Sequence, residues 1–300
     1  MKKLLYILLA TVVAFASCTD TPSIDPPLEE NPEGEMPEGE KPSDENQNEA
    51  DQLQRPGSDF KSAYIKQIAL WEFTGAWCAN CPGGYTNMNF ILSTNPDFTE
   101  VVHPMAFHSN STDVDDLAIK ETDVIMQDKN LVSLGFPSYI VDLLYGGSLV
   151  ENVSLTTNLY DTIEDNPCFC GVAVSSTLDG SEAKVTVKLT PELNSAWRMA
   201  VYVVEDKVKY YQKDGMKEHD QYTHRHVVRQ VVSSSYKGDR IGAQVNPAGQ
   251  ELTADYKITV DAAWNVDNTY VYVLALDNLG YVNNMNCCQI NGGNSDYIKL

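Results

Sequence analysis

The sequence predicts an α/β layer in its first folded part and an all-β sandwich in its second. Between residues 60 and 165, apolar runs of strand length alternate with stretches of helical spacing, as in α/β folds. After Asn166-Pro167, seven strand-like runs follow one another, separated by turn dipeptides such as Asp179-Gly180. Three hundred residues with 43% hydrophobic composition suffice for two such domains.

Charge and composition set apart the segment that precedes the folded part. The formal net charge of −21 argues against nucleic acid as a partner, because such binding needs clustered Lys and Arg. Residues 19–57 hold twelve acidic and two basic residues, seven prolines and no aromatic residue. Such a segment cannot bury enough apolar surface to fold. Residues 18–57 are therefore predicted to form a disordered acidic tether.

Residues 1–17 have the pattern of an export signal. Lys2 and Lys3 precede an apolar run that is too short to span a bilayer, and small residues follow. The cleavage region "FASC" resembles a bacterial lipobox, which implies that Cys18 becomes the lipidated first residue of the mature protein. Ordinary secretion without lipidation is the alternative. Lipidation of Cys18 leaves six of the seven cysteines, an even number that suits an exported protein.

The predicted α/β part, residues 58–165, begins with a near-continuous apolar run at 66–74, as expected for a strand covered on both faces. The further elements read from apolar spacing and from proline positions are a helix after the cysteines, strands at 101–107 and 136–142, and helices within 115–134 and 154–164.

About seven alternating strands in the roughly 130 residues of the second part, 166–300, suggest an immunoglobulin-like sandwich. Residues 206–221 would then form a long connection, followed by a strand that carries His224 and His226. We expect these histidines and His219 to form hydrogen bonds on the sheet surface; a metal site is the alternative.

The stretch "EFTGAWCANCPGG", residues 72–84, contains two cysteines two residues apart. Thiol exchange needs a thiolate attacker and a second thiol nearby, and a helix N-terminus lowers the pKa of a cysteine. Cys78, at the predicted strand-to-helix junction, is the expected attacker, and Cys81, one turn into the helix, is the resolving cysteine. An inert disulfide is the second interpretation. A zinc half-site is the third, but His103 and His108 lack zinc spacing, so we expect no metal and no cofactor.

Glu72 lies on the same predicted strand face as Ile68 and Leu70. Its carboxyl is therefore predicted to be partly buried, with a raised pKa. Such a group near Cys81 would accept the proton of that thiol during exchange. A structural carboxylate at the strand end is the alternative.

These residues resemble the active-site segment of thioredoxin-like proteins, in which an apolar strand and an aromatic residue precede Trp-Cys-x-x-Cys. In that family a buried acid stands six residues before the first cysteine, where this chain has Glu72. A cis-proline opens a later strand, where "GFPSY" supplies Pro137. The Pro-Gly-Gly after the second cysteine departs from the family pattern. The resemblance implies a catalytic set of Cys78, Cys81 and Glu72, with substrate bound beside Trp77, Phe136 and Pro137.

Four further cysteines lie in the sandwich part. Cys168 and Cys170 have the same strand parity and should both point into the core, whereas the adjacent Cys287 and Cys288 should face opposite ways. Because the exported compartment permits disulfides, we expect one structural bridge between a member of each pair.

The whole order, from lipobox through acidic tether and cysteine pair to β-sandwich, resembles a family of Bacteroidetes outer-membrane lipoproteins, the twenty-eight-kilodalton outer membrane protein family. The resemblance covers about residues 60–300. It implies an outer-membrane location and membrane attachment through lipidated Cys18, and the acidic segment resembles the signal that sends such lipoproteins to the cell surface. Two functions are open: thiol–disulfide exchange with protein thiols and disulfides, or non-enzymatic binding as a surface protein or adhesin that uses the thioredoxin-like fold as a scaffold.

Overall fold

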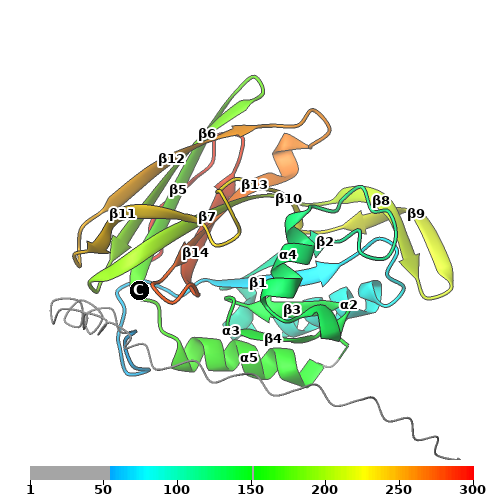
Figure 1. Cartoon of the computed structure of the whole chain (residues 1–300), viewed down its shortest axis with the longest axis horizontal. Helices are drawn as coiled ribbons and strands as arrows, with labels where there is room; N and C mark the ends of the chain where they lie inside the picture. Colours follow the sequence, from blue (N-terminus) through cyan, green and yellow to red (C-terminus); the bar gives the residue numbers. More distant parts are fainter. Residues whose placement is uncertain (1–54, 151) are drawn as a thin grey trace, which may run out of the picture. The chain divides into compact units, whose positions relative to one another are not determined.

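The computed structural model of the chain describes residues 55–150 and 152–300, in which strands predominate (Figure 1). The predicted export signal, Cys18 and residues 19–54 of the predicted tether lie outside the described residues. Arg55, assigned to the tether, is instead attached to the folded part, where it pairs with Asp277 and donates a hydrogen bond to Asn166 Oδ1 at 3.0 Å. Within the described residues, no helix combines the length and the apolarity needed to cross a bilayer.

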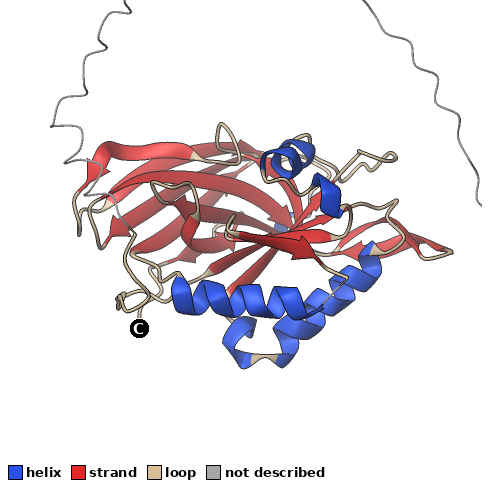
Figure 2. Cartoon of the chain, turned by 60° about the horizontal axis from the view of Figure 1, so that its bottom comes forward, coloured by secondary structure: helices blue, strands red, loops and turns tan. Residues whose placement is uncertain are grey.

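The first half is built on β1 (Ile68–Thr74), which pairs in parallel with β2 (Val102–His108) and antiparallel with β3 (Ser138–Val141). Every residue of β1 is buried, because helices cover the sheet on both faces. Ile68 and Leu70 pack with α2 (Cys81–Thr94) and α5 (Asn152–Asp165). Figure 2 shows these long helices on one side of the sheet. The opposite face of β1 packs with α4 (Glu121–Asp128). The remaining short elements are α3 (Pro96–Thr99), a 3-10 turn (Val132–Leu134) and β4 (Tyr145–Ser148).

The second half forms a β-sandwich, as predicted, with an apolar core between two sheets. One sheet has four strands in the order β12-β6-β5-β15, with alternating burial along β6 that places every second side chain in the core. Its strands are β5 (Cys170–Asp179), β6 (Glu182–Pro191), β12 (Leu252–Thr259) and β15 (Asn294–Ser295). The facing strands are β7 (Ser195–Glu205), β10 (Val227–Val231), β11 (Asp239–Asn246), β13 (Thr269–Leu276) and β14 (Val282–Gln289), with a 3-10 turn at Val266–Asn268.

The two halves share one sheet, which the sequence did not predict. Strand β10 pairs in parallel with β2, with Val227 opposite Ala106, and Ala106 N donates to His226 O at 2.7 Å. The order along the joined sheet is β14-β13-β7-β10-β2-β1-β3-β4, with β11 also paired to β7. This pairing satisfies the outer edge of β2, which would otherwise present unpaired backbone groups. Near residue 166, where the sequence pattern changes, the chain passes to the four-stranded sheet of the sandwich. The joined sheet itself continues from one half into the other.

Residues 206–221, predicted to be a long loop, mostly belong to a β-hairpin of β8 (Val208–Asp214) and β9 (Lys217–His224). Asp214 pairs with Lys217, and Gly215 adopts a φ of 60° at the first position of the two-residue loop. Glycine accepts this positive φ without strain, so it suits such a tight hairpin turn.

The expected disulfide between Cys168 or Cys170 and Cys287 or Cys288 is wrong, because all four cysteines are free thiols. The register explains the difference. Phe169 N donates to Asn283 Oδ1 at 2.9 Å, and Asn284 Nδ2 donates to Cys170 O at 2.8 Å. Cys287 lies three residues beyond Asn284, about 10 Å along the strand, which exceeds the reach of a disulfide. Burial raises the pKa of Cys287 to about 11 and that of Cys288 to about 12.

Gly84 and Gly83 in the first turns of α2 allow a matched test of the packing around the cysteine pair. A Cβ on Gly84 would lie 2.4 Å from Pro137 Cγ, whereas a Cβ on Gly83 meets nothing within 4 Å. We predict that G84A lowers the free energy of unfolding by about 1–3 kcal/mol through overpacking. G83A should instead raise it by up to about 1 kcal/mol, since Ala favours the helix. Urea denaturation measures both, and equal effects would show that Pro137 yields to the added methyl group.

Candidate functional site

The two cysteines of the Cys-x-x-Cys stretch form a disulfide with a Cα–Cα distance of 5.4 Å. The sequence had suggested that Cys81 lies one turn into the helix. Helix α2 instead begins at Cys81, so this cysteine is its first residue. Cys78 precedes it in a turn, where Cys81 N donates to Cys78 O at 3.3 Å. Both residues are largely buried, with exposed fractions of 5% for Cys78 and 2% for Cys81. Cys78 is the more accessible of the two.

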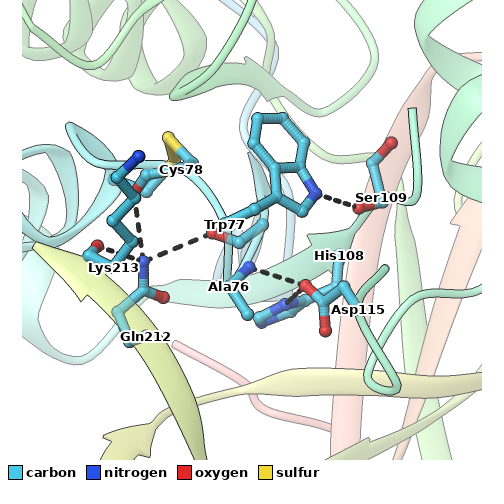
Figure 3. The surroundings of a disulfide bond; sticks show 10 residues. Ala76, Trp77, Cys78, His108, Ser109, Asp115, Gln212 and Lys213 are labelled. Atoms are coloured by element: carbon cyan, nitrogen blue, oxygen red, sulfur yellow. Dashed lines mark hydrogen bonds and ion pairs between the residues drawn. A yellow bond between two sulfur atoms is a disulfide. The ribbon is translucent and has the colours of Figure 1, made fainter. Parts of the chain in front are cut away.

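The hairpin β8–β9 holds the turn that contains Cys78 (Figure 3). Gln212 Nε2 donates to Cys78 O at 3.0 Å and to Gly75 O at 3.3 Å. Two backbone bonds continue the contact, from Lys213 N to Ala76 O and from Gly215 N to Ala79 O. A segment more than 130 residues away in the sequence therefore fixes the backbone of the cysteine turn.

Glu72 lies on β1 with its side chain on the face that α2 covers, and it is 3% exposed. Burial raises the pKa of its carboxyl from 4.5 to about 8. Glu72 and Cys81 line the same small cavity. The centre of a water molecule is able to move within about 20 Å³ of it, which is enough space for one water. The predicted burial and raised pKa of Glu72 are thus confirmed.

His108, at the end of β2, lines the same cavity and is bound to a buried carboxylate. Its Nδ1 lies 2.7 Å from Asp115 Oδ2, which also accepts a hydrogen bond from Ala76 N at 2.7 Å. Figure 3 shows the His108 ring and this backbone nitrogen both directed at the Asp115 carboxylate. Burial alone would raise the pKa of Asp115, but the hydrogen bonds from His108 and from the backbone lower it below its ordinary value.

The sequence had suggested that the histidines of the second half lie together on a sheet surface, but the structure separates them. Strand β9 ends at His224, and His226 follows in a turn with a φ of 54°. His224 is buried, with its ring centroid 5.0 Å from that of His108. His219 remains exposed near Asp214. His103 lies toward the other end of β2, where its Nε2 is bonded to Gln67 Oε1, so it does not join His108.

The three residues expected to bind substrate lie beside the cysteine turn. The rings of Trp77 and Phe136 meet edge to face at 5.2 Å, and Trp77 Nε1 donates to Ser109 O at 2.7 Å. The Phe136–Pro137 peptide bond is cis, as expected, and Pro137 packs on Gly84 of α2. Phe136 also lines a second cavity, of about 160 Å³, together with Ser111, Asp123, Met126, Gln127 and Val132.

Sequence reasoning missed Gln212, Asp115 and His224 as residues of the site. Gln212 and His224 come from the hairpin that was read as a loop and a surface strand, and no local pattern links them to Cys78. Asp115 lies seven residues after His108 in the loop that follows β2, so no strand or helix spacing relates the two side chains. Their grouping depends on the pairing of β10 with β2, which periodicity does not report.

Comparison with known proteins gives one family and two solved structures. The family model described as outer membrane protein Omp28 matches residues 127–292, more than half of the chain and all of it beyond the cysteine pair. HBP35 of Porphyromonas gingivalis has a similar fold, with a TM-score of 0.63, 19% identity and coverage of 77% of both chains. A domain of the outer membrane lipoprotein Omp28 from the same organism covers 41% of this chain and 89% of its own, with 19% identity and a TM-score of 0.29. No curated protein matches the chain.

The raised pKa of Glu72 predicts a pH-dependent loss of stability. Between pH 4.5 and about 8, the unfolded chain releases a proton that the folded chain retains, so stability falls as pH rises through this window and then levels off. E72Q removes the carboxyl. Its stability relative to wild type should be almost constant below pH 4.5 and should rise by a few kcal/mol towards pH 8.

Urea denaturation across this pH range measures the difference. E164Q, which changes an exposed glutamate on α5, is the matched control and should show no such trend. A difference between E72Q and wild type that is independent of pH would mean that Glu72 ionises normally in the folded protein.

Proposed function

This chain belongs to the Omp28 outer membrane protein family, and from that premise we propose that it exchanges disulfides with protein thiols at the outer membrane through Cys78 and Cys81. The family match supports the outer-membrane location, and it includes most of the sandwich half. It begins at residue 127 and therefore does not include the cysteine pair. The exchange function rests on the residues around that pair.

We place the chain on the membrane through a lipid attached to Cys18. The lipobox-like "FASC" and the acidic segment behind it support this assignment. A tether of this length would hold the folded part away from the bilayer and leave it free to meet protein partners. The same acidic segment supports display at the cell surface.

We interpret the first half as a thioredoxin-like unit. Four features support this interpretation: the parallel pair β1–β2, the antiparallel β3 and β4, the cysteine turn ahead of α2, and the cis bond before Pro137. Cys78, the less buried residue of the pair, is then the attacker. The positive end of the α2 dipole faces the cysteine turn and favours a thiolate there.

The observation that carries the proposal is the Glu72 carboxyl in one cavity with Cys81. A disulfide that only closes a loop needs no ionisable group behind it, and a buried carboxyl with a pKa near 8 destabilises the fold at neutral pH. Carboxyls of this kind cluster at sites that transfer protons. We therefore assign Glu72 as a proton acceptor for the Cys81 thiol at pH values above about 8, where its carboxyl is ionised.

The proposed reaction conserves atoms and electrons in two steps. The Cys78 thiolate attacks one sulfur of a substrate disulfide, forms a mixed disulfide and releases one substrate thiolate. Cys81 then loses its proton and attacks Cys78 Sγ, so that the Cys78–Cys81 bond forms and the second substrate sulfur leaves as a thiolate. Two electrons pass from the protein dithiol to the substrate; the reverse sequence oxidises a substrate dithiol.

Trp77, Phe136 and Pro137 are the proposed substrate contacts. They surround the cysteine turn, and the backbone next to Pro137 is the assigned partner for an extended substrate segment. The 160 Å³ cavity beside Phe136 would accept a side chain of that segment, because Met126 and Val132 give it an apolar wall.

Serine variants test the assignment of the two cysteines. After treatment of the reduced chain with glutathione disulfide, C81S should accumulate a mixed disulfide at Cys78, since no thiol remains to resolve it. C78S should form much less, because the Cys81 sulfur is buried behind the turn. Intact-mass spectrometry measures both species. C287S, which removes a half-buried thiol away from the turn, should behave as wild type.

An equal absence of mixed disulfide in C81S and C78S would contradict the exchange function. The chain would then be a non-enzymatic binding protein whose first half serves as a scaffold, and the disulfide would be structural.

A further inference from the structure

His108 is held in one tautomer by Asp115. An ionised carboxylate only accepts hydrogen bonds, so the 2.7 Å contact to Asp115 Oδ2 makes Nδ1 of His108 the protonated nitrogen. Asp115 is itself fixed by Ala76 N at 2.7 Å and by Leu117 N at 2.9 Å. The lone pair of the neutral imidazole therefore lies on Nε2.

Nε2 of His108 has no hydrogen-bond partner among the residues that the structure describes, although His108 is only 1% exposed. Buried polar atoms without a partner are rare in proteins, because each one lowers stability. His108 lines the cavity that also contains Cys81 and Glu72. A ring nitrogen without a hydrogen-bond partner among the described residues thus belongs to a histidine that shares a cavity with the resolving cysteine.

The other ionisable groups around the cavity are poor proton acceptors at neutral pH. Burial raises the pKa of Glu72 to about 8, so its carboxyl is mostly protonated at neutral pH. Burial and the neighbouring His108 lower the pKa of His224 to about 4, so His224 is a weak acceptor. The remaining groups are Tyr85 and Tyr222, whose pKa values burial raises, and Arg225, which is paired with Asp206.

We propose that His108 accepts the proton of the Cys81 thiol when Cys81 resolves a mixed disulfide, with Asp115 as its positioning residue. This proposal rests on the exchange function. The proton moves to Nε2, the Cys81 sulfur forms its bond to Cys78 Sγ, and the bond from Cys78 to the substrate breaks. Its electron pair leaves with the substrate thiolate. The imidazolium then lies beside the Asp115 carboxylate, which compensates its charge until solvent takes the proton.

Ellman's reagent separates the two cysteine steps on the reduced full-length chain. Attack by Cys78 releases one thionitrobenzoate, and resolution by Cys81 releases the second from the mixed disulfide. The C78S variant, which retains the other thiols, gives the background. Stopped-flow absorbance then compares wild type with H108N from acid pH to above pH 8, the pKa of Glu72.

The two histidines of β2 provide a matched pair of variants. In H108N the amide still donates to Asp115 but does not accept a proton. H103N changes the other histidine of the strand, which is half-buried, is bonded to Gln67 and lies outside the cavity. Both variants replace a histidine ring of β2 by an amide, and only H108N does so at the cavity.

We expect H108N to slow the second release about tenfold or more near neutral pH, with no change in the first release. The difference should shrink above pH 8, where ionised Glu72 takes the proton. H103N should leave both releases unchanged. A second release in H108N with the wild-type rate and pH profile would overturn the proposal. If wild type itself shows no first release above background, the exchange function fails, and this proposal with it.

A measurement on the unmodified chain covers the case in which H108N does not fold. Reduction of the disulfide creates a thiol at the cavity that His108 lines, so the proposal requires the nitrogen NMR signal of Nε2 to shift between the oxidised and the reduced protein. An unchanged signal would overturn the proposal. H108Q, which has a longer neutral side chain, repeats the kinetic comparison.

Discussion

The site around the disulfide depends on the pairing of β10 with β2. The parallel pairing of Val227 with Ala106, which includes the hydrogen bond from Ala106 N to His226 O, marks the place where the sandwich sheet joins the α/β sheet. This junction brings the end of β9 to the cavity, where His224 lies next to His108. It also positions Gln212 to hold the carbonyl groups of the cysteine turn. Without this pairing the cavity would lose the wall that β9 supplies.

Two features that lower stability meet at the cavity. Glu72 is a buried carboxyl with a raised pKa, and His108 has a buried nitrogen without a partner among the described residues. Both line the cavity that Cys81 also lines, and neither is required by a disulfide that only closes a turn. The family match begins after these residues, yet it includes the hairpin that covers them. The two halves of the chain therefore contribute jointly to one site.

Local signals in the sequence predicted the parts of the site that depend on neighbours in the chain. The pairing of Cys78 with Cys81 and the burial of Glu72 follow from patterns of a few residues, and the cis bond before Pro137 was expected from the resemblance to thioredoxin-like proteins. Non-local features were missed, because periodicity indicates which face a side chain occupies and not which strand lies beside it. The hairpin was read as a loop for this reason. The disulfide predicted for the sandwich failed because the offset of Asn284 against Cys170 separates the two cysteine pairs.

The reduction potential of the Cys78–Cys81 pair tests the exchange function most directly. The full-length chain would be equilibrated with glutathione buffers, its thiols trapped by alkylation, and the two redox states counted by mass spectrometry. We predict a potential between about −270 and −120 mV, the range of known exchange catalysts. A potential below about −300 mV, typical of structural disulfides, would contradict an exchange function for this protein.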